Sequence, residues 1–188
     1  MDYGELYWLE KYLFDTVQKE FLKNGKLNAF DFFCIVIWKA NRAKSKIALK
    51  LLKKDQTEKD LNKIVEDLTQ SLYNAKDHKQ RLEILISKWG FRLPMASAIL
   101  TVLYPKDFTV YDTRVCSILG EFDNIQNKPK FEDIWNGYCQ FKKMVASKAP
   151  QALTLRNKDR YLWGQSFAQN LNKDINDIFS KTTEEEID

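Results

Sequence analysis

The chain has 188 residues, of which 44% are hydrophobic and 30% are charged, and its formal net charge is +4. This length is enough for one compact unit with a real core, and no apolar run approaches the roughly 18 residues that a membrane-spanning helix needs. One histidine and three widely spaced cysteines (Cys34, Cys116 and Cys139) fit reduced thiols, and they argue against a disulfide framework, a zinc site or a four-cysteine iron–sulfur cluster.

The N-terminal part of the chain has the apolar spacing of helices. Apolar residues at helical intervals predict a first helix over residues 6–21 that closes near Gly25. Asn28 can cap a second helix containing the apolar run Phe32–Trp38. Such a run also suits a buried strand, but the helical spacing on either side of it favours a helix.

Two further helices are predicted before residue 75. Residues 44–54 form a Lys-rich helix, and Asp55-Gln56 ends it. The segment Thr57–Asp60 resembles a capping box with Asp in place of Glu, and it precedes an apolar stripe from Leu61 to Leu72.

Residues 78–104 predict two helices joined by a tight hairpin. Gly90 ends the first helix, because glycine readily takes a positive φ, and Pro94 suits the first turn of the second. The apolar stripes are Leu82, Leu85, Ile86 and Trp89 before the turn, and Ala96, Ile99, Leu100 and Leu103 after it.

A third helix follows the hairpin after a short extended piece. Pro105 ends the preceding helix, and Phe108 to Tyr111 leads to Asp112. The stripe after it places Asp112 at a helix N-cap. Its members are Val115, Ile118, Leu119 and Phe122.

The rest of the chain predicts a loop, two more helices and an acidic tail. The loop covers residues 124–130, and the next helix runs from Phe131 to near Pro150. The last helix starts around Arg156 or Lys158, and residues 182–188 form the tail. The whole chain, 1–188, is therefore expected to be all-α, as a single compact helical unit or as two interleaved lobes.

Positive charge is concentrated in two stretches. Without the four acids of the tail, the other 181 residues carry 30 basic and 22 acidic side chains, a formal charge of +8. Basic stripes of this kind attract phosphate backbones, although a solvated helix face is the simpler explanation. The first stretch is Lys39, Arg42, Lys44, Lys46, Lys50, Lys53 and Lys54, and the second is Lys76, Lys79, Arg81, Lys88, Arg92, Lys106 and Arg114.

Residues 78–122 resemble the helix-hairpin-helix DNA glycosylases. That family has a hairpin of the form L-P-G-V-G-x-K/S-T-A, followed by an Asp about 18 residues after the K/S position. Aligned on Ala96, Gly90 matches the first hairpin glycine, Pro94 falls on the K/S position, and Asp112 lies 18 residues beyond it. The chain departs from the pattern at Arg92, which replaces the second glycine, and at Pro94, which replaces the lysine of bifunctional members.

The resemblance implies an all-α, two-lobed fold and a role for Asp112 as the catalytic carboxylate. A plain helix cap is the alternative role for this residue. Because Pro94 has no amine, the resemblance implies a monofunctional mechanism with Asp and water, unless another Lys, such as Lys88 or Lys106, substitutes. It also implies that the hairpin backbone holds a phosphate and a monovalent cation, with no other cofactor and no side-chain metal site. The alternative is an ordinary packing corner between two helices.

The same resemblance assigns roles to basic and aromatic residues. The expected DNA-binding residues are Lys88, Gly90, Arg92, Lys106 and Arg114. The expected base pocket includes Trp163, Gln165 and Tyr111, since a base needs a flat wall and a few polar edges. A helix face with its aromatic side chains turned inward is the alternative for the segment 156–166.

The sequence thus predicts a monomeric base-excision repair protein that binds duplex DNA and hydrolyses the N-glycosidic bond of a damaged or mismatched base. Its acidic N-terminus lacks the form of a signal peptide, which suggests an intracellular location, cytoplasmic or nucleoid-associated. Two alternatives are a non-catalytic DNA-binding module with the same hairpin and a helical protein-interaction domain whose basic block meets an acidic partner.

Overall fold

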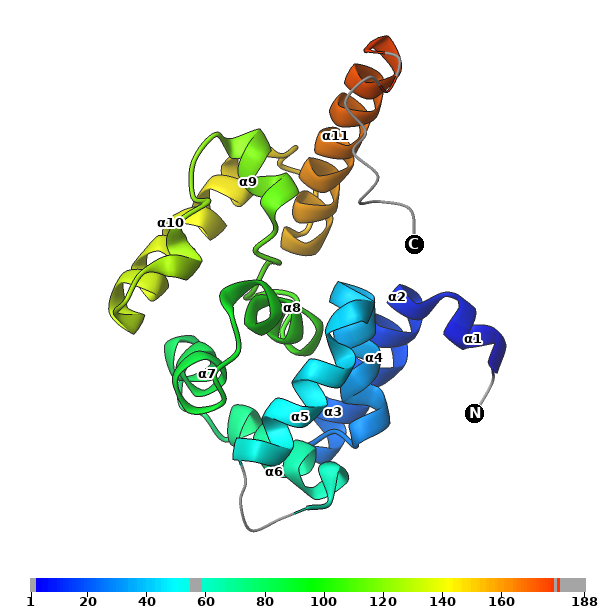
Figure 1. The fold of residues 1–188 in the computed structure, drawn as a ribbon, viewed down its shortest axis with the longest axis vertical. Coiled ribbons are helices and arrows are strands. Elements are labelled where there is room, and N and C mark those ends of the chain that lie inside the picture. The colour runs from blue at the N-terminus through cyan, green and yellow to red at the C-terminus, as the bar shows by residue number, and fades with distance from the viewer. Residues whose placement is uncertain (1–2, 55–58, 178, 180–188) are drawn as a thin grey trace.

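A computed structural model describes residues 3–54, 59–177 and 179, and all regular structure within them is helical (Figure 1). The all-α prediction is confirmed for this part of the chain. The α-helices are α1 (Tyr3–Tyr7), α2 (Leu9–Tyr12), α3 (Gln18–Asn24), α4 (Ala29–Ala40), α5 (Lys44–Lys54), α6 (Leu61–Tyr73), α7 (His78–Glu83), α8 (Leu93–Leu103), α9 (Thr113–Leu119), α10 (Phe131–Lys148) and α11 (Leu155–Asn176). Two π-helical turns (Leu13–Val17 and Ile84–Lys88) and two 3₁₀ turns (Asn41–Ala43 and Ile125–Asn127) complete them.

The helices form two groups (Figure 1). Helix α4 packs against α6 and α8, and α5 packs against α6, in the larger group of α2 to α8. Helices α9, α10 and α11 pack on one another in the smaller group. The segment 104–112 joins the two groups, and their buried apolar side chains belong to one connected core.

The first predicted helix is interrupted twice in the structure. The expected single helix over residues 6–21 is interrupted at Trp8, which has φ −97° and ψ 60°, and again at the π turn Leu13–Val17. An apolar stripe reports which face is buried but not where the hydrogen-bond ladder shifts, and Leu13 and Val17 are both fully buried as the stripe requires. Asn28 caps α4 as predicted, since its side chain accepts from the Asp31 N–H.

The predicted capping box before α6 falls partly outside the described residues, because Thr57 belongs to the undescribed segment 55–58. Asp60 is itself the N-cap of α6, and its side chain accepts from the Asn62 N–H at 2.9 Å. The apolar run Phe32–Trp38 lies within α4, so it forms a helix and not a strand.

The hairpin between α7 and α8 is closed by backbone hydrogen bonds around Gly90. Gly90 has φ 70°, and its N–H donates to Ile86 O while the Phe91 N–H donates to Leu85 O. These bonds satisfy carbonyls at the end of the first helix and turn the chain into α8, whose first turn contains Pro94.

After α8 the chain runs back along the same helix. The Phe108 N–H donates to Tyr104 O near the C-terminal end of α8, and the Tyr111 N–H donates to Ser97 Oγ at 2.8 Å near its N-terminal end. Asp112 therefore returns to the end of α8 that adjoins the hairpin. Lys106 does not flank the hairpin as expected, because it follows the other end of α8, a helix roughly 16 Å long.

Candidate functional site

A cavity of about 530 Å³ lies where the two groups of helices meet. Ionisable side chains of both signs and two tryptophans line most of it. They are Glu10 from α2, Trp38 and Lys39 from α4, Asp112 before α9, and Arg156, Asp159, Arg160 and Trp163 from α11.

Asp112 serves both as a helix cap and as part of the cavity wall. One carboxylate oxygen, Oδ1, accepts from the Arg114 N–H at 3.0 Å and so caps α9 as predicted. The other oxygen, Oδ2, forms a short ion pair with Lys39 Nζ, which comes from the last turn of α4. The Lys39 and Asp112 side chains are 16% and 19% exposed, so this ion pair is partly shielded from water.

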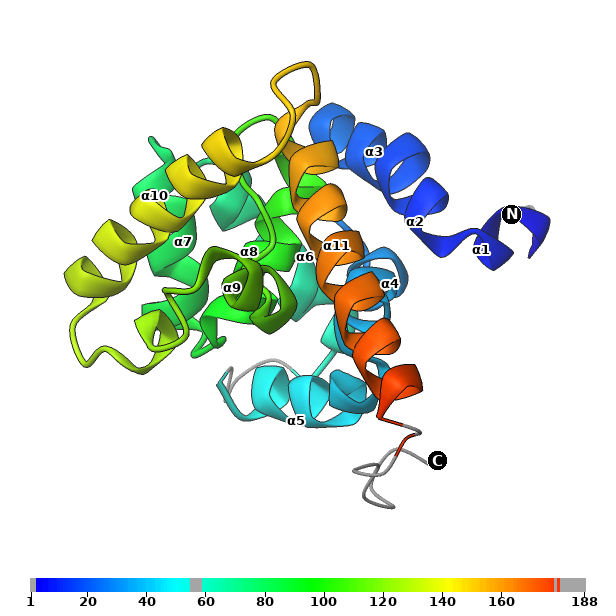
Figure 2. The same cartoon turned by 90° about the horizontal axis from the view of Figure 1, so that it is seen from above.

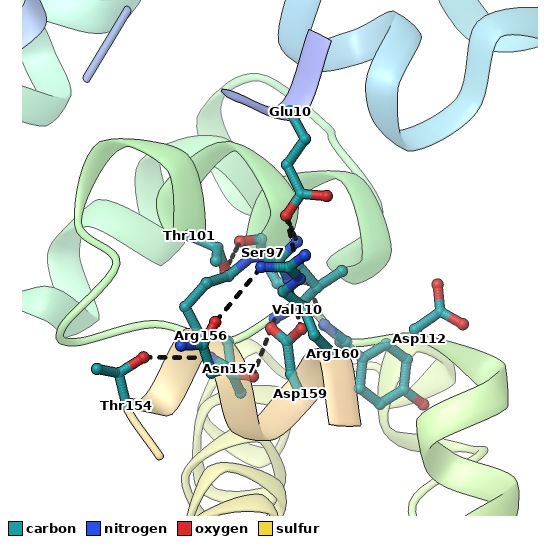
Figure 3. Close-up of polar contacts among 12 residues, drawn as sticks. Glu10, Ser97, Thr101, Val110, Asp112, Thr154, Arg156, Asn157, Asp159 and Arg160 are labelled. Atoms are coloured by element: carbon teal, nitrogen blue, oxygen red, sulfur yellow. Dashed lines mark hydrogen bonds and ion pairs between the residues drawn. The ribbon is translucent and has the colours of Figure 1, made fainter. Parts of the chain in front are cut away.

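A second ionic network fixes the segment that leads to Asp112 (Figure 3). Asp159 Oδ2 accepts from the Thr109 hydroxyl at 3.0 Å and from the Val110 N–H at 3.2 Å. Its Oδ1 pairs with Arg156. Both oxygens of Asp159 therefore have fixed partners, and this buried carboxylate anchors the residues just before Asp112 to α11.

Arg156 is the centre of this network. Its guanidinium pairs with Glu10 at 2.7 Å (Figure 3). It also lies 5.2 Å from the Phe14 ring centroid and 5.1 Å from that of Trp38. Arginine between aromatic faces and carboxylates combines stacking with charge pairing. Arg156 thus ties α11 to α2 and α4 across the junction between the two groups.

Of the three residues expected in a base pocket, Trp163 alone lines this cavity. Tyr111 is 1% exposed, packs on Phe141 and donates its hydroxyl to Phe122 O, so it belongs to the core. Burial raises the pKa of the Tyr111 phenol, which therefore stays neutral at physiological pH. Gln165 is exposed on α11 and is not among the residues that line the cavity.

Helix α5 adds basic side chains next to the hairpin. Lys88, Gly90 and Arg92 are exposed, as a DNA contact requires. Lys50 Nζ donates to Gly90 O at 2.6 Å, so α5 lies directly against the turn. Along α5 runs a shallow groove of about 400 Å³ lined by Lys46, Leu49, Lys50, Lys53 and Lys54.

The same contact bears on the cation expected at the hairpin. The Lys50 ammonium already occupies the Gly90 carbonyl, and the monovalent cation itself stays a prediction. Among the described residues, no cluster of three or more His, Cys, Asp or Glu side chains is placed to bind a metal ion.

Arg114 lies in the first turn of α9, the helix that packs against α11 (Figure 2). Its guanidinium lies 5.4 Å from the Trp163 ring centroid and 5.9 Å from that of Phe167. Arg114 therefore belongs to the rim of the cavity and contacts aromatic rings of α11.

The sequence reasoning missed several cavity residues, among them Lys39 and Arg156. Lys39 was counted within a basic block, and nothing in its own neighbourhood distinguishes it from the other lysines. Its position in the last turn of the helix containing the run Phe32–Trp38 was the only available signal, because such a buried helix ends next to other core elements.

Comparison of the chain with protein-family models, curated proteins and solved structures finds no match. The described helices include none with the length and apolar character that a bilayer crossing demands.

Proposed function

We propose that this protein is a helix-hairpin-helix DNA glycosylase-like enzyme that binds duplex DNA and excises a damaged or mismatched base. The observation that carries the proposal is the placement of Asp112. Its cap oxygen holds the residue at the start of α9, and its second oxygen pairs with Lys39 in the wall of a cavity that two tryptophans also line. A residue serving only as a cap would need no such cavity.

The cavity suits a nucleobase turned out of the duplex. Its volume of about 530 Å³ falls in the usual range of small-ligand pockets, roughly 300–1,000 Å³. Trp38 and Trp163 offer flat apolar surfaces, and Arg160 and Lys39 offer donors to polar edges of the base.

The chemistry follows from the carboxylate. As the C–N bond breaks, its electron pair leaves with the base and the sugar becomes cationic. The Asp112 carboxylate stabilises that cation and orients the water that attacks the anomeric carbon, which leaves an abasic site. Lys39 holds Asp112 in place before the substrate arrives, and its flexible side chain must move aside for Oδ2 to face the sugar.

Lys39 also supports a second route. Pro94 in α8 has no amine, but the Lys39 amine lies against Asp112 and could attack the sugar to form an imine. Hydrolysis by water remains the proposed route, because an ammonium paired with a carboxylate is a poor nucleophile.

Base release from duplexes that each contain one damaged or mismatched base tests the proposal. The expected product is an abasic site from one member of the panel, and the activity should depend on Asp112. Salt-dependent duplex binding without base release by the parent protein on any substrate would favour the non-catalytic DNA-binding module. Absence of duplex binding at low salt would leave the protein-interaction domain.

A further inference from the structure

The aromatic residues at the rim of the cavity form a small exposed stack. The rings of Trp163 and Phe167 are parallel, with an interplanar angle of 5° and a centroid separation of 5.6 Å. They are 43% and 46% exposed, which is unusual for two adjacent large aromatic side chains. Trp163 also lines the cavity that contains Asp112, so the stack begins at the site and extends outward along α11.

A cation accompanies the stack. The Arg114 guanidinium contacts both rings, and among the described residues no carboxylate forms an ion pair with it. Arg114 lies only two residues after Asp112, and the Asp112 side chain caps its N–H. An exposed planar stack beside an unpaired guanidinium offers both a surface for a π-system and a charge for a phosphate.

The shape of the patch argues against a second helix as its occupant. Exposed apolar side chains continue along α11 at Leu171 and Ile175, each four residues after the last. Four residues turn an α-helix about 40° beyond a full turn, so the row drifts by roughly 120° between Trp163 and Ile175. A straight partner helix would therefore leave one end of the row uncovered, whereas a single flat ligand needs only the parallel pair.

We propose that Trp163, Phe167 and Arg114 form a stacking platform for an unpaired nucleobase outside the cavity. This inference rests on the proposed binding of duplex DNA but not on base excision. When one base enters the cavity, a neighbouring base loses its stacking partner, and the platform replaces that partner. The ligand class is thus DNA with a locally unpaired nucleotide, which the protein distinguishes from a fully paired duplex.

The test compares two labelled duplexes that differ by one extra, unpaired adenine, with affinities measured by fluorescence anisotropy at one salt concentration. The parent protein should bind the bulged duplex about tenfold or more tightly than the paired one. Phe167→Leu removes the ring of the stack that does not line the cavity, and it should reduce that preference at least threefold while leaving affinity for the paired duplex within about twofold. Tyr161→Leu is the matched control, because Tyr161 is a similarly exposed aromatic residue on the same helix, and it should change neither affinity.

Arg114→Lys provides a second variant that conserves the charge. It should reduce the preference for the bulged duplex, because an ammonium does not stack on rings as a guanidinium does. Circular dichroism and thermal unfolding establish that each variant is folded.

Several results would overturn the platform. They are an equal affinity of the parent for both duplexes, a preference retained at the parent level in Phe167→Leu, and an equal loss of affinity for both duplexes in that variant. A change of sedimentation behaviour in Phe167→Leu, with the preference for the bulged duplex intact, would assign the stack to self-association. Failure to bind either duplex at low salt would instead overturn the proposed function together with this inference, and so is distinguishable from the other outcomes.

Discussion

Replacing Asp112 by Asn separates the two roles that the structure gives this residue. The amide oxygen of Asn can still accept from the Arg114 N–H, so the cap of α9 is conserved. The variant loses the negative charge opposite Lys39, whose side chain is 16% exposed. Removing one partner of a fully buried pair costs about 3–5 kcal/mol, and exposed pairs contribute about 0–1 kcal/mol.

The Lys39–Asp112 pair lines a cavity that water can enter, so we expect its loss to cost about as much as the loss of an exposed pair. Water can reach and hydrate the ammonium, although the Asn amide nitrogen that replaces Oδ2 cannot accept from it. The free energy of unfolding should fall by about 1 kcal/mol, which corresponds to roughly 2–4 °C in Tm for a chain of this size. Affinity for duplex DNA should hold or rise, because a negative charge facing the phosphates has been removed.

Base release should fall much further than stability. If Asp112 stabilises the cationic sugar, its neutral replacement should lose on the order of 3 kcal/mol of transition-state stabilisation, or about 100-fold or more in rate. Single-turnover base release on the substrate that the parent excises measures this loss without interference from product release.

Asp77→Asn is the matched control for this prediction. Asp77 is the N-cap of α7, and its side chain accepts from the Gln80 N–H at 2.7 Å, but it does not line the cavity. The stabilities of the two variants should differ by no more than about 1 kcal/mol, the contribution of the Lys39–Asp112 pair, and only Asp112→Asn should lose activity. Base release at the parent rate by Asp112→Asn would reduce Asp112 to a helix cap and remove the centre of the enzyme proposal.

Three further predictions concern the mechanism, the DNA surface and the buried thiols. Borohydride treatment with an abasic duplex should trap no covalent adduct, whereas an adduct that disappears in Lys39→Gln would establish the imine route through Lys39. Replacing Lys88 and Arg92 by Ala should weaken binding equally across DNA sequences and reduce the slope of log K against log salt by up to about two. The control Lys148→Ala on α10 should do neither. Unchanged affinity of the Lys88/Arg92 variant at low salt would remove the hairpin from the interface. Burial raises the pKa of the Cys116 thiol from 9.0 to about 11, so the thiol ionises first in the unfolded chain, and stability should decline as pH rises from about 9 to 11. The Tm of Cys116→Ser should fall less steeply than that of the parent over this range. Equal slopes of Tm against pH would show that Cys116 does not cause the decline.

The sequence predicted the local turns well because their causes are local. A positive φ at Gly90, a proline in the next helical turn and an Asp at a helix start each depend on a few neighbouring atoms. The same reasoning could not find the break at Trp8 or the π turn that follows it. Apolar spacing over residues 6–21 is the same whether or not the backbone ladder shifts by one residue.

The site was less predictable, because its members come from four separate parts of the chain. Distance along the sequence placed Lys106 near the hairpin, but the length of α8 separates them. It placed Tyr111 in a pocket, but in the irregular segment before α9 the neighbours Val110 and Asp112 line the cavity while Tyr111 is buried in the core. Lys50 and Lys39 reach the hairpin and the carboxylate only through the packing of α5 and α4, which a single sequence does not encode in any short motif.

The cavity contains three carboxylates, and the bonds they make show which one is available for chemistry. Both oxygens of Asp159 are bonded, to Thr109, Val110 and Arg156, and breaking these bonds would detach the segment before Asp112 from α11. Glu10 is 38% exposed and pairs with an arginine that two aromatic rings hold in place, so neither partner moves easily.

Asp112 differs from Asp159 and Glu10 in how its oxygens are bonded and in how easily its partner can move. One oxygen is fixed by the cap, which orients the carboxylate, and the other has a lysine as its partner. A lysine side chain has four rotatable bonds and a compact charge, and around Lys39 the structure shows no aromatic clamp comparable to that of Arg156 within the described residues. Swinging this ammonium aside leaves the helix cap, the Asp159 network and the core unchanged. Of the three carboxylates, Asp112 is thus the one that can present a free oxygen to a substrate without loss of structure.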